Sequence, residues 1–228
     1  MDFEQLMRVV KRRRSSWHFR SDPVPEADIE KIVDAARYAP SGFNSQLWEF
    51  VAVTDPELRS RVVEIVAASV PRPPKGLDPV PALRGDRAIP VKDPLGFRTA
   101  PVFVLVLGDT RVRPFGPPPV RADDAAWETV LTSTLAVAYE HMHLAAAALG
   151  LATRWVSAAG HDPAASEIKG VLGIPEYLVL YDVMALGSSD FEPLPKKLRP
   201  LTEVLHYNAC GADDFRSQAE VEEYFAGR

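Results

Sequence analysis

Three short stretches of the 228-residue sequence combine residue types that suit a charged, planar ligand. The first is Arg13-Arg14-Ser15, within the basic run Lys11–Ser16. Guanidinium groups beside a hydroxyl can make paired, charge-assisted hydrogen bonds to a phosphate. A solvated basic patch or a targeting signal has the same composition. The stretch by itself therefore indicates a candidate phosphate site and no more.

The second and third stretches lie further along the chain. Residues 39–48 place small residues and side-chain amides between a predicted helix and a predicted strand. Such a loop lets a flat polar ring lie close to the backbone, although an ordinary loop of turn-forming residues has the same composition. Lys197-Leu198-Arg199 follows the last predicted core strand and a proline-rich turn, and taken alone it is typical of a charged surface loop.

Apolar spacing predicts the helices that position these stretches. Ile29, Ile32, Val33 and Ala36 repeat at helical spacing, and prolines bracket that segment. The longest predicted helix, 125–149, is apolar over most of its circumference, which predicts burial on several sides in a core or a subunit interface. Further helices are predicted within 1–11, after Asp55-Pro56, and at 220–225.

Apolar runs at 48–53, 101–107 and 178–186 predict strands, the last two of them buried. A long loop rich in proline fills 71–97, and a loop of this length is usually functional or mobile. A second proline-rich loop is predicted at 111–121. The pattern favours an α+β (mixed α/β) fold, with a mixed central sheet flanked by helices.

Composition narrows the class of protein. The net charge of −5 argues against nucleic acid or an anionic membrane surface as a partner. The single cysteine, Cys210, excludes an intramolecular disulfide and a cysteine-based metal cluster, which fits a reducing compartment. We find no membrane-spanning run and no secretory signal, so we expect a cytoplasmic protein.

Together with further motifs, the three stretches resemble the FMN-dependent nitroreductase family. Members carry Arg-Arg-Ser followed four residues later by an aromatic residue, which here is Phe19. They continue with Ala-Pro-Ser-x-x-Asn-x-Gln-Pro-Trp, matched here over 39–48 except that Leu47 replaces the proline. Later matches are Gly150-Leu151 with Thr153 and Trp155, Leu172-Gly173-Ile174-Pro175, Leu186-Gly187, and Lys197 with Arg199, Pro200, Leu201 and Val204. The resemblance extends from Arg12 to Asn208.

The resemblance implies a role for each matching residue. The FMN phosphate would be held by Arg13, Ser15, Lys197 and Arg199, with the backbone of Arg14 passing close by. The residues that would come from the partner subunit and cover the isoalloxazine are Pro40, Ser41, Gly42 and Asn44. A backbone N–H near Ser157 or Ala158 would point at flavin N5, where a donor stabilises the reduced ring.

The resemblance also implies an intertwined homodimer whose subunits are single FMN-binding domains, 1–228, each with an extended tail from about residue 208. The implied reaction takes hydride from NAD(P)H and passes it to a small organic acceptor in a ping-pong cycle. The acceptor is a nitroaromatic, a quinone or an activated alkene. The implied chemistry is centred on the flavin, so no side chain is assigned a catalytic role and no metal is expected. His141 and His143 lie two apart on a predicted helix and so are expected in a core or interface.

Three rival functions remain open: a reductive dehalogenase, a flavin-fragmenting enzyme of the cobalamin-ligand pathway, and an FMN-binding reservoir or sensor without turnover. One departure from the family also matters. Many members carry Lys or Arg two residues after the serine, at the N1/O2 edge of the flavin, and this chain has Trp17. Either that edge lacks a cation, or Trp17 packs against the flavin or a helix while another residue, such as Arg154 or Arg98, supplies the charge.

Overall fold

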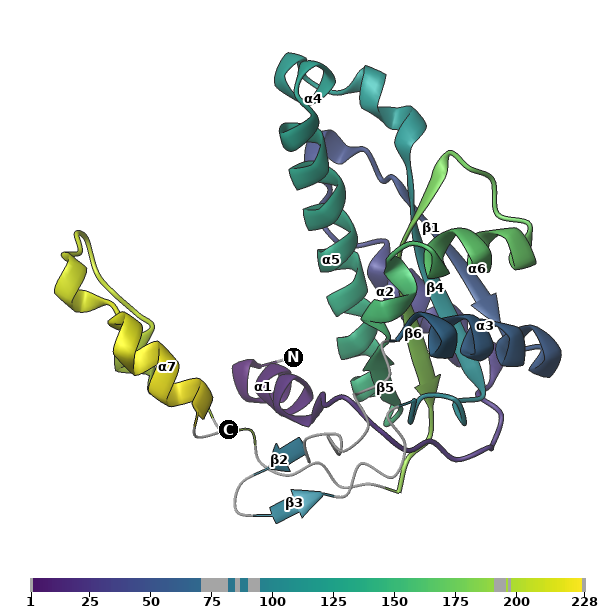
Figure 1. Ribbon diagram of the computed structural model, residues 1–228, viewed down its shortest axis with the longest axis horizontal. Coiled ribbons are helices and arrows are strands. Elements are labelled where there is room, and N and C mark those ends of the chain that lie inside the picture. The colour runs from purple at the N-terminus through teal and green to yellow at the C-terminus, as the bar shows by residue number, and fades with distance from the viewer. Residues whose placement is uncertain are drawn as a thin grey trace. The chain divides into compact units, whose positions relative to one another are not determined.

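A computed structural model of the chain describes residues 2–70, 82–84, 87–89, 95–190, 196 and 198–226. These residues form two compact units, the first within 1–72 and 93–193 and the second within 73–92 and 194–228. The first unit contains a four-stranded sheet and the helices α1 to α6, and the second contains the strands β2 and β3 and the helix α7 (Figure 1).

The sheet of the first unit has the strand order β1-β4-β6-β5, and all neighbouring strands are antiparallel. The strands are β1 (Trp48–Val53), β4 (Val102–Asp109), β5 (Ala152–Trp155) and β6 (Leu178–Gly187). Every side chain of β4 from Val102 to Leu107 is buried, which explains why this run is apolar without alternation. The three predicted strands and the α+β class are confirmed.

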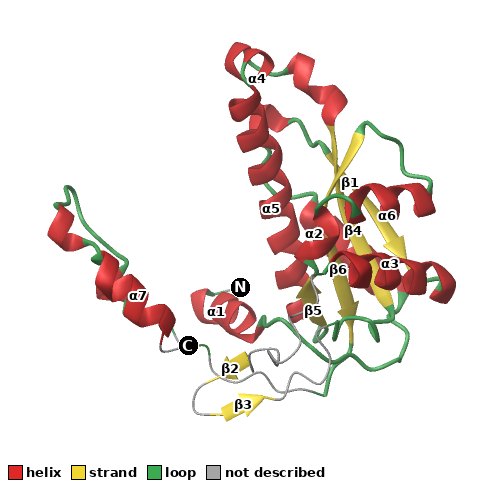
Figure 2. Ribbon diagram, in the orientation of Figure 1, coloured by secondary structure: helices red, strands yellow, loops and turns green. Residues whose placement is uncertain are grey.

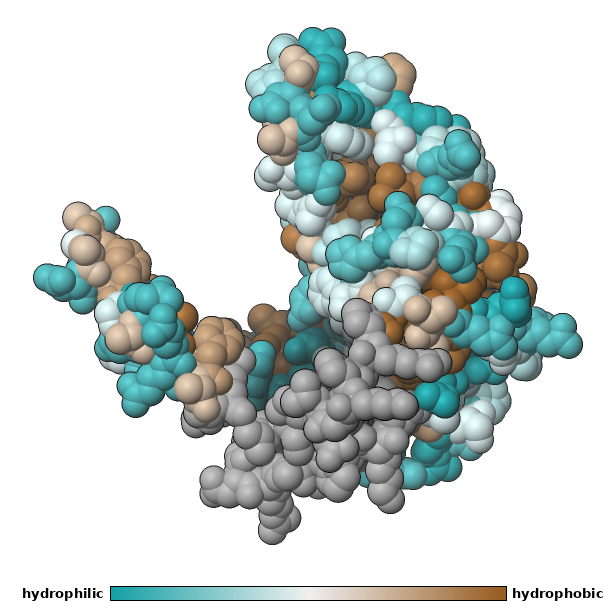
Figure 3. All heavy atoms as spheres, viewed as in Figure 1, coloured by the Kyte–Doolittle hydropathy of each residue, from teal (hydrophilic) through white to brown (hydrophobic). Residues whose placement is uncertain are grey.

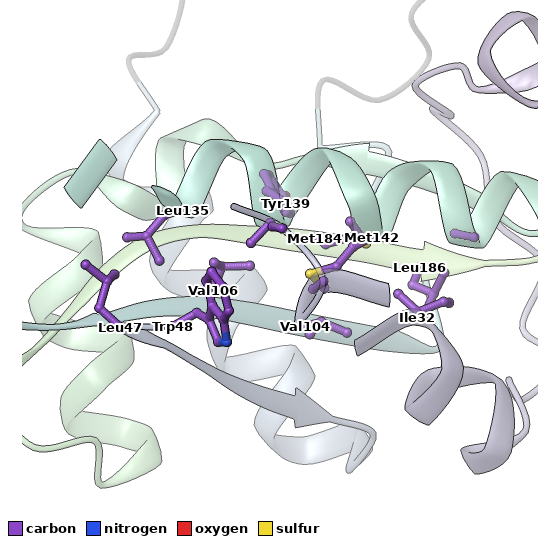
Figure 4. Close-up of a cluster of buried hydrophobic side chains, with 14 of the residues drawn as sticks. Ile32, Leu47, Trp48, Val104, Val106, Leu135, Tyr139, Met142, Met184 and Leu186 are labelled. Atoms are coloured by element: carbon purple, nitrogen blue, oxygen red, sulfur yellow. The ribbon is translucent and has the colours of Figure 1, made fainter. Parts of the chain in front are cut away.

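Helices cover both faces of this sheet (Figure 2). One face, which includes Val104 and Val106, packs against α2 and α5, and Figure 4 shows this core, with Tyr139 and Met142 of α5 over the strands. The other face, which includes Phe103 and Leu105, packs against α3 and α6. The bounds of these helices are α2 (Glu26–Ala36), α3 (Pro56–Ser69), α5 (Asp124–Ala148) and α6 (Ala164–Leu172).

Helix ends follow the chemistry of their sequences. At the start of α3 the carboxylate of Asp55 accepts a hydrogen bond from Leu58 N at 2.8 Å. At the start of α5 the carboxylate of Asp123 accepts one from Ala125 N at 2.9 Å. Gly150 follows α5 with φ of 82°, a left-handed conformation that glycine adopts without steric penalty. The predicted glycine stop is therefore confirmed.

Within one chain α5 is buried along one side only. Its buried residues include Leu135, Ala138 and Met142, whereas Thr132 and Ser133 on the opposite side are exposed. The core of the single chain thus covers one of the several sides predicted to be buried in a core or a subunit interface. The open side carries small residues such as Thr132 and Ser133, so the sequence does not show which side the core covers.

The helix α1 (Phe3–Arg12) confirms the helix predicted near the N-terminus, but none of its residues is fully buried. Phe3, Leu6 and Val10 lie on one face and are 70%, 39% and 39% exposed. Since apolar side chains at i, i+3 and i+7 form one stripe, α1 presents an uncovered apolar face within the single chain.

Three parts of the chain differ from the sequence-based expectation. The loop predicted at 111–121 is mostly helical, as η2 (Thr110–Phe115) and α4 (Pro118–Ala122), because proline is tolerated in the first turn of a helix. The short strand β5 and the helix α6 were not predicted, since four residues and a helix interrupted by Gly170 give weak periodicity. Of the loop predicted at 71–97, most residues lie outside the described part of the chain.

The second unit contains a short hairpin and the C-terminal segment. β2 (Ala82–Arg84) pairs antiparallel with β3 (Arg87–Ile89). The C-terminal segment includes η4 (Leu201–Glu203), η5 (Ala212–Asp214) and α7 (Gln218–Ala226), which confirms the terminal helix predicted at 220–225. Apolar side chains lie at its surface (Figure 3). The ring of Tyr207 is also exposed, at 75%.

Candidate functional site

The edge strand β5 connects two of the predicted site segments. Ser15 forms an isolated parallel bridge with Thr153 of β5, and Ser16 N donates to Thr153 O at 2.8 Å. At the other end of β5 the chain enters η3 (Ser157–Gly160), which holds the predicted N5-facing residues. At about 3.3 Å per residue, the two segments are separated by roughly 13 Å along the strand. A ligand with a phosphate at one end and a ring at the other fits such an arrangement.

Arg13 is the cation at the phosphate end of this edge. It follows the last residue of α1, its side chain is 23% exposed, and its Nε lies 3.6 Å from Glu140 Oε1 of α5. Arg14 Nη1 donates to the carbonyl oxygen of Arg13 at 2.7 Å. The half-buried guanidinium is therefore held in place by a carboxylate that an incoming phosphate can replace.

A buried histidine of α5 contacts Thr153, the residue that pairs with Ser15. His143 of α5 is 2% exposed, and its Nδ1 lies 2.7 Å from Thr153 Oγ1, whose residue also pairs with Ser15. Burial, followed by the charge of Arg13, lowers the pKa of His143 to about 3, so its ring is neutral at physiological pH. His141 lies elsewhere, with Nδ1 3.1 Å from Ala35 O. The prediction that the two histidines point apart is confirmed: His143 is buried in the core, and His141 is half-buried.

The loop 39–48 has an unusual backbone. Phe43, Asn44 and Gln46 all adopt positive φ, at 45°, 53° and 45°, which is unfavourable for residues other than glycine. Ser41 Oγ accepts from Gln46 N at 3.1 Å and so closes the turn. Strain of this kind persists where the surroundings impose it, and it clusters at ligand sites.

The same loop is anchored on α5. Gly42 N donates to Thr134 Oγ1 at 3.3 Å, and a Cβ on Gly42 would lie 2.6 Å from Val130 Cγ1. Thr134 precedes His143 by nine residues, or about 13 Å along a helix axis. Pro40 and Asn44 are exposed. The loop therefore projects from a different part of α5 than the segment that His143 supports, as expected if it serves the partner's site.

The guanidinium of Arg154 lies over the ring of Trp17, the residue that departs from the family pattern. The guanidinium carbon of Arg154, in β5, is 3.6 Å from the centre of the Trp17 ring, and it is also 5.7 Å from that of Phe97. A guanidinium over an indole face is a favourable cation–π pair. The structure thus places the Arg154 guanidinium against Trp17, the residue that stands where many family members carry Lys or Arg.

The turn at the other end of β5 is held tightly against β6. Val156 N donates to Val183 O at 2.9 Å, and a Cβ on Gly160 would lie only 2.2 Å from Tyr181 O. Ser157 is exposed and Ala158 half-buried. As the first residues of a 3₁₀-helix, their N–H groups have no partner within that helix and are available to a ligand.

Asp182 was not among the predicted site residues. It is 6% exposed, its Oδ2 accepts from Trp155 Nε1, and its Oδ1 accepts from Val183 N at 3.1 Å. Burial raises the pKa of Asp182 to about 6, with the two hydrogen bonds acting in the opposite direction. One signal was present in the sequence, because Asp182 is the one charged residue within an apolar strand and buried carboxylates are rare.

The third predicted stretch belongs to the second unit. Arg199 donates through Nη2 to Glu203 O at 2.6 Å, and its Nε lies 3.4 Å from Glu203 Oε2. Lys197 lies outside the described residues. The roles assigned to Lys197 and Arg199 therefore stay predictions.

Metal sites and membrane-spanning helices can be assessed for the described part of the chain. No group of three or more His, Cys, Asp or Glu side chains there is arranged to hold a metal ion. No described helix has the length and apolar character that crossing a bilayer requires.

The sheet, its covering helices and the edge-strand site define an α+β protein with a candidate ligand site at one sheet edge. Residues 10–188 match the model of the nitroreductase family, which is most of the chain. NADH dehydrogenase of Thermus thermophilus is 30% identical over 203 residues, covering 85% of this chain and 91% of that protein. The chain therefore belongs to the nitroreductase family.

Two further similarities concern a part of the chain and its fold. Iodotyrosine deiodinase 1 of Rattus norvegicus is 35% identical over 66 residues, which are 29% of this chain and 23% of that protein. Among solved structures, NADPH:FMN oxidoreductase of Vibrio harveyi in complex with NAD⁺ has a TM-score of 0.67 at 20% identity, covering 97% of this chain and 85% of that chain. The structural likeness shows a common fold.

Proposed function

We propose that the protein is an FMN-dependent oxidoreductase of one domain with a C-terminal tail, located in the cytoplasm. It takes hydride from NAD(P)H and passes it, in a ping-pong cycle, to a nitroaromatic, a quinone or an activated alkene. The observation that carries the proposal is the edge strand β5, which has a basic segment paired to one end and a turn with available N–H groups at the other. Family membership supports the choice of FMN as the ligand.

The residues present fit a flavin mononucleotide. Arg13, the N–H groups near Arg14 and the hydroxyl of Ser15 suit its phosphate. The family resemblance assigns Lys197 and Arg199 to the same phosphate. Trp17 offers an aromatic surface beside the ring. From the partner subunit, the strained loop with Pro40, Ser41, Gly42 and Asn44 covers the isoalloxazine.

FMN, when bound, supplies the centre that accepts hydride from NAD(P)H and gives it to the acceptor. The protein binds and orients the flavin, and the N–H groups of Ser157 and Ala158 donate toward the N5 edge, where charge develops. Sharing one flavin face between donor and acceptor requires each to leave before the other enters.

A direct test uses purified protein and added FMN. We expect a yellow protein whose released chromophore is FMN and which oxidises NAD(P)H faster when a nitroaromatic is present. Protein that remains colourless with excess FMN would rule out the proposed function. Bound flavin without NAD(P)H oxidation would instead favour the reservoir or sensor.

A reductive dehalogenase is a second candidate, favoured by the local similarity to iodotyrosine deiodinase 1. Incubating the reduced, FMN-loaded protein with a halogenated phenol and measuring halide release separates this activity from nitroreduction. Product analysis under oxygen detects the third possibility, because a flavin-fragmenting enzyme consumes the flavin itself.

We propose a homodimer that does not separate into folded monomers. Support comes from the uncovered apolar stripe of α1 at Phe3, Leu6 and Val10, and from the open side of α5. We expect sedimentation of the apoprotein to give twice the chain mass at micromolar concentration. A compact 25.1 kDa species with native circular dichroism would contradict the dimer. Deleting residues 210–228 should weaken the association if the tail packs on the partner.

We expect Arg154, stacked on Trp17, to supply the positive charge at the N1/O2 edge of the flavin. A cation at 4 Å from the reduced ring contributes about 4 kcal/mol at an effective dielectric of 20, less after solvation. If about 1–2 kcal/mol of this is retained, Arg154→Gln makes the two-electron midpoint potential more negative by roughly 20–45 mV.

Potentiometric titration of the loaded proteins tests this assignment, with Arg98→Gln as a control that should leave the potential unchanged. Trp17→Lys should also have little effect, because the edge is already compensated. A raised potential in Trp17→Lys, together with no change in Arg154→Gln, would mean that the edge of the native site lacks a cation.

A further inference from the structure

The turn that presents Ser157 and Ala158 is built on a distortion in the neighbouring strand. The pairing of β4 with β6 shifts register after Val106, which opposes Asp182, because Leu107 opposes Leu180. Tyr181 is therefore the extra residue of a β-bulge, and such bulges redirect side chains at functional sites. At this bulge Tyr181 O lies against the Gly160 backbone, and Asp182 accepts from the indole N–H of Trp155, the last residue of β5.

Three contacts join the turn to three consecutive residues of this bulge. Tyr181 O is in close contact with the Gly160 backbone, Asp182 accepts from the Trp155 indole N–H, and Val183 O accepts from Val156 N. Each end of the segment 155–160 is thus attached to the same short stretch of β6. A single displacement at residue 182 would be transmitted to both ends of the turn.

The indole of Trp155 lies in an aromatic environment that leaves little freedom. Its ring centre is 4.3 Å from that of Tyr139 in an edge-on arrangement and 5.9 Å from that of His143. With the N–H held by a carboxylate at the same time, one rotamer is specified by packing and by a charge-assisted hydrogen bond. Asp182 is buried, and its hydrogen bonds from Trp155 Nε1 and Val183 N lie within the protein.

We propose that Asp182 is a positioning residue for the flavin-facing turn, acting through Trp155 to fix the orientation of the Ser157 and Ala158 N–H groups. A buried carboxylate is unfavourable to folding unless it is well bonded, and an apolar residue would suit this strand better for stability alone. A carboxylate at this position therefore points to a role in the geometry of the adjoining turn. This inference rests on the proposed flavin site for its functional consequence, but its structural part concerns the protein alone.

The experiment compares Asp182→Asn, Asp182→Ala and Trp155→Phe in the full-length protein. Asparagine keeps an acceptor for the indole without the charge, alanine removes the acceptor, and phenylalanine removes the donor. Amide hydrogen exchange of Val156 and Ala159, whose N–H groups are hydrogen-bonded within the protein, is measured without flavin as the first readout. We expect the alanine and phenylalanine variants to exchange there about tenfold faster or more, in line with the loss of a hydrogen bond to a charged group, while β4 stays protected. Asparagine should restore most of the protection.

The second readout uses the FMN-loaded proteins. We expect the alanine and phenylalanine variants to bind FMN but to show a more negative midpoint potential and a several-fold lower kcat, with a smaller change in KM. Asp109→Ala, which removes a strand-end carboxylate paired with Arg111, is a matched control and should change neither readout.

Unchanged exchange at Val156 and Ala159 in both the alanine and the phenylalanine variants would overturn the proposal, as would an unchanged midpoint potential where exchange is faster. If Asp182→Ala does not fold, Trp155→Phe and Asp182→Asn still decide the matter. Failure of the proposed function is recognised separately, because wild-type protein would then not bind FMN. The exchange measurement is made without flavin, so it would still test whether Asp182 positions the turn.

Discussion

Replacing Arg13 with alanine raises the dissociation constant of FMN by roughly 10- to 150-fold, the equivalent of about 1.5–3 kcal/mol for a lost hydrogen bond to a charged group. The expectation follows from the position of Arg13, half-buried beside the segment that pairs with β5. Partial burial keeps the phosphate contact from being screened as a surface pair would be. Quenching of flavin fluorescence on titration with apoprotein measures the change.

Two variants separate phosphate binding from general electrostatics. Arg12→Ala removes the preceding, exposed cation and should change the dissociation constant by less than about threefold, since exposed charges contribute little. Glu140→Gln removes the carboxylate that lies 3.6 Å from Arg13 and should tighten FMN binding. Equal losses in Arg12→Ala and Arg13→Ala would mean that the basic run attracts the phosphate only through its net charge.

Replacing Gly160 with alanine destabilises the protein by about 1–3 kcal/mol, as expected for overpacking at a close contact. A Cβ at this position would lie 2.2 Å from Tyr181 O. Because that atom belongs to the main chain of β6, no flexible side chain can move aside, and the turn itself must shift. Urea unfolding at a fixed protein concentration measures the effect, since a dimer's stability depends on concentration. The turn displacement should also weaken FMN binding.

Gly170→Ala is the matched control. Gly170 lies in α6, where a Cβ would meet nothing within 4 Å. Alanine there should stabilise the helix by roughly 0.5–1 kcal/mol, because glycine loses more backbone entropy on folding. The two substitutions are chemically identical and should act with opposite signs. A Gly160→Ala protein as stable as wild type would show that the turn is not in tight contact with the β-bulge.

Much of the fold follows from local patterns in the sequence. The apolar runs of β1, β4 and β6 predict strands, and the helical spacing of α2 predicts a helix. These patterns are local, because a buried strand needs a short apolar run and a half-buried helix needs apolar residues every three to four positions. The strand β5 was missed because four residues, Ala152–Trp155, give no periodic signal. The helical turns in 110–122 were missed because their prolines suggest a loop until the position of each proline within its turn is known.

The sequence by itself determined which chemical groups are available: a cluster of guanidinium groups at 13–14 and a loop of small and amide residues. It also contains the series of motifs that resembles the family. Only the tertiary structure decided which of these residues meet. The pairing of Ser15 with Thr153, the stacking of Arg154 on Trp17 and the bond from Trp155 to Asp182 join residues far apart in the chain. No local pattern encodes such contacts, because they depend on how strands pair and on a β-bulge whose register is set by the whole sheet.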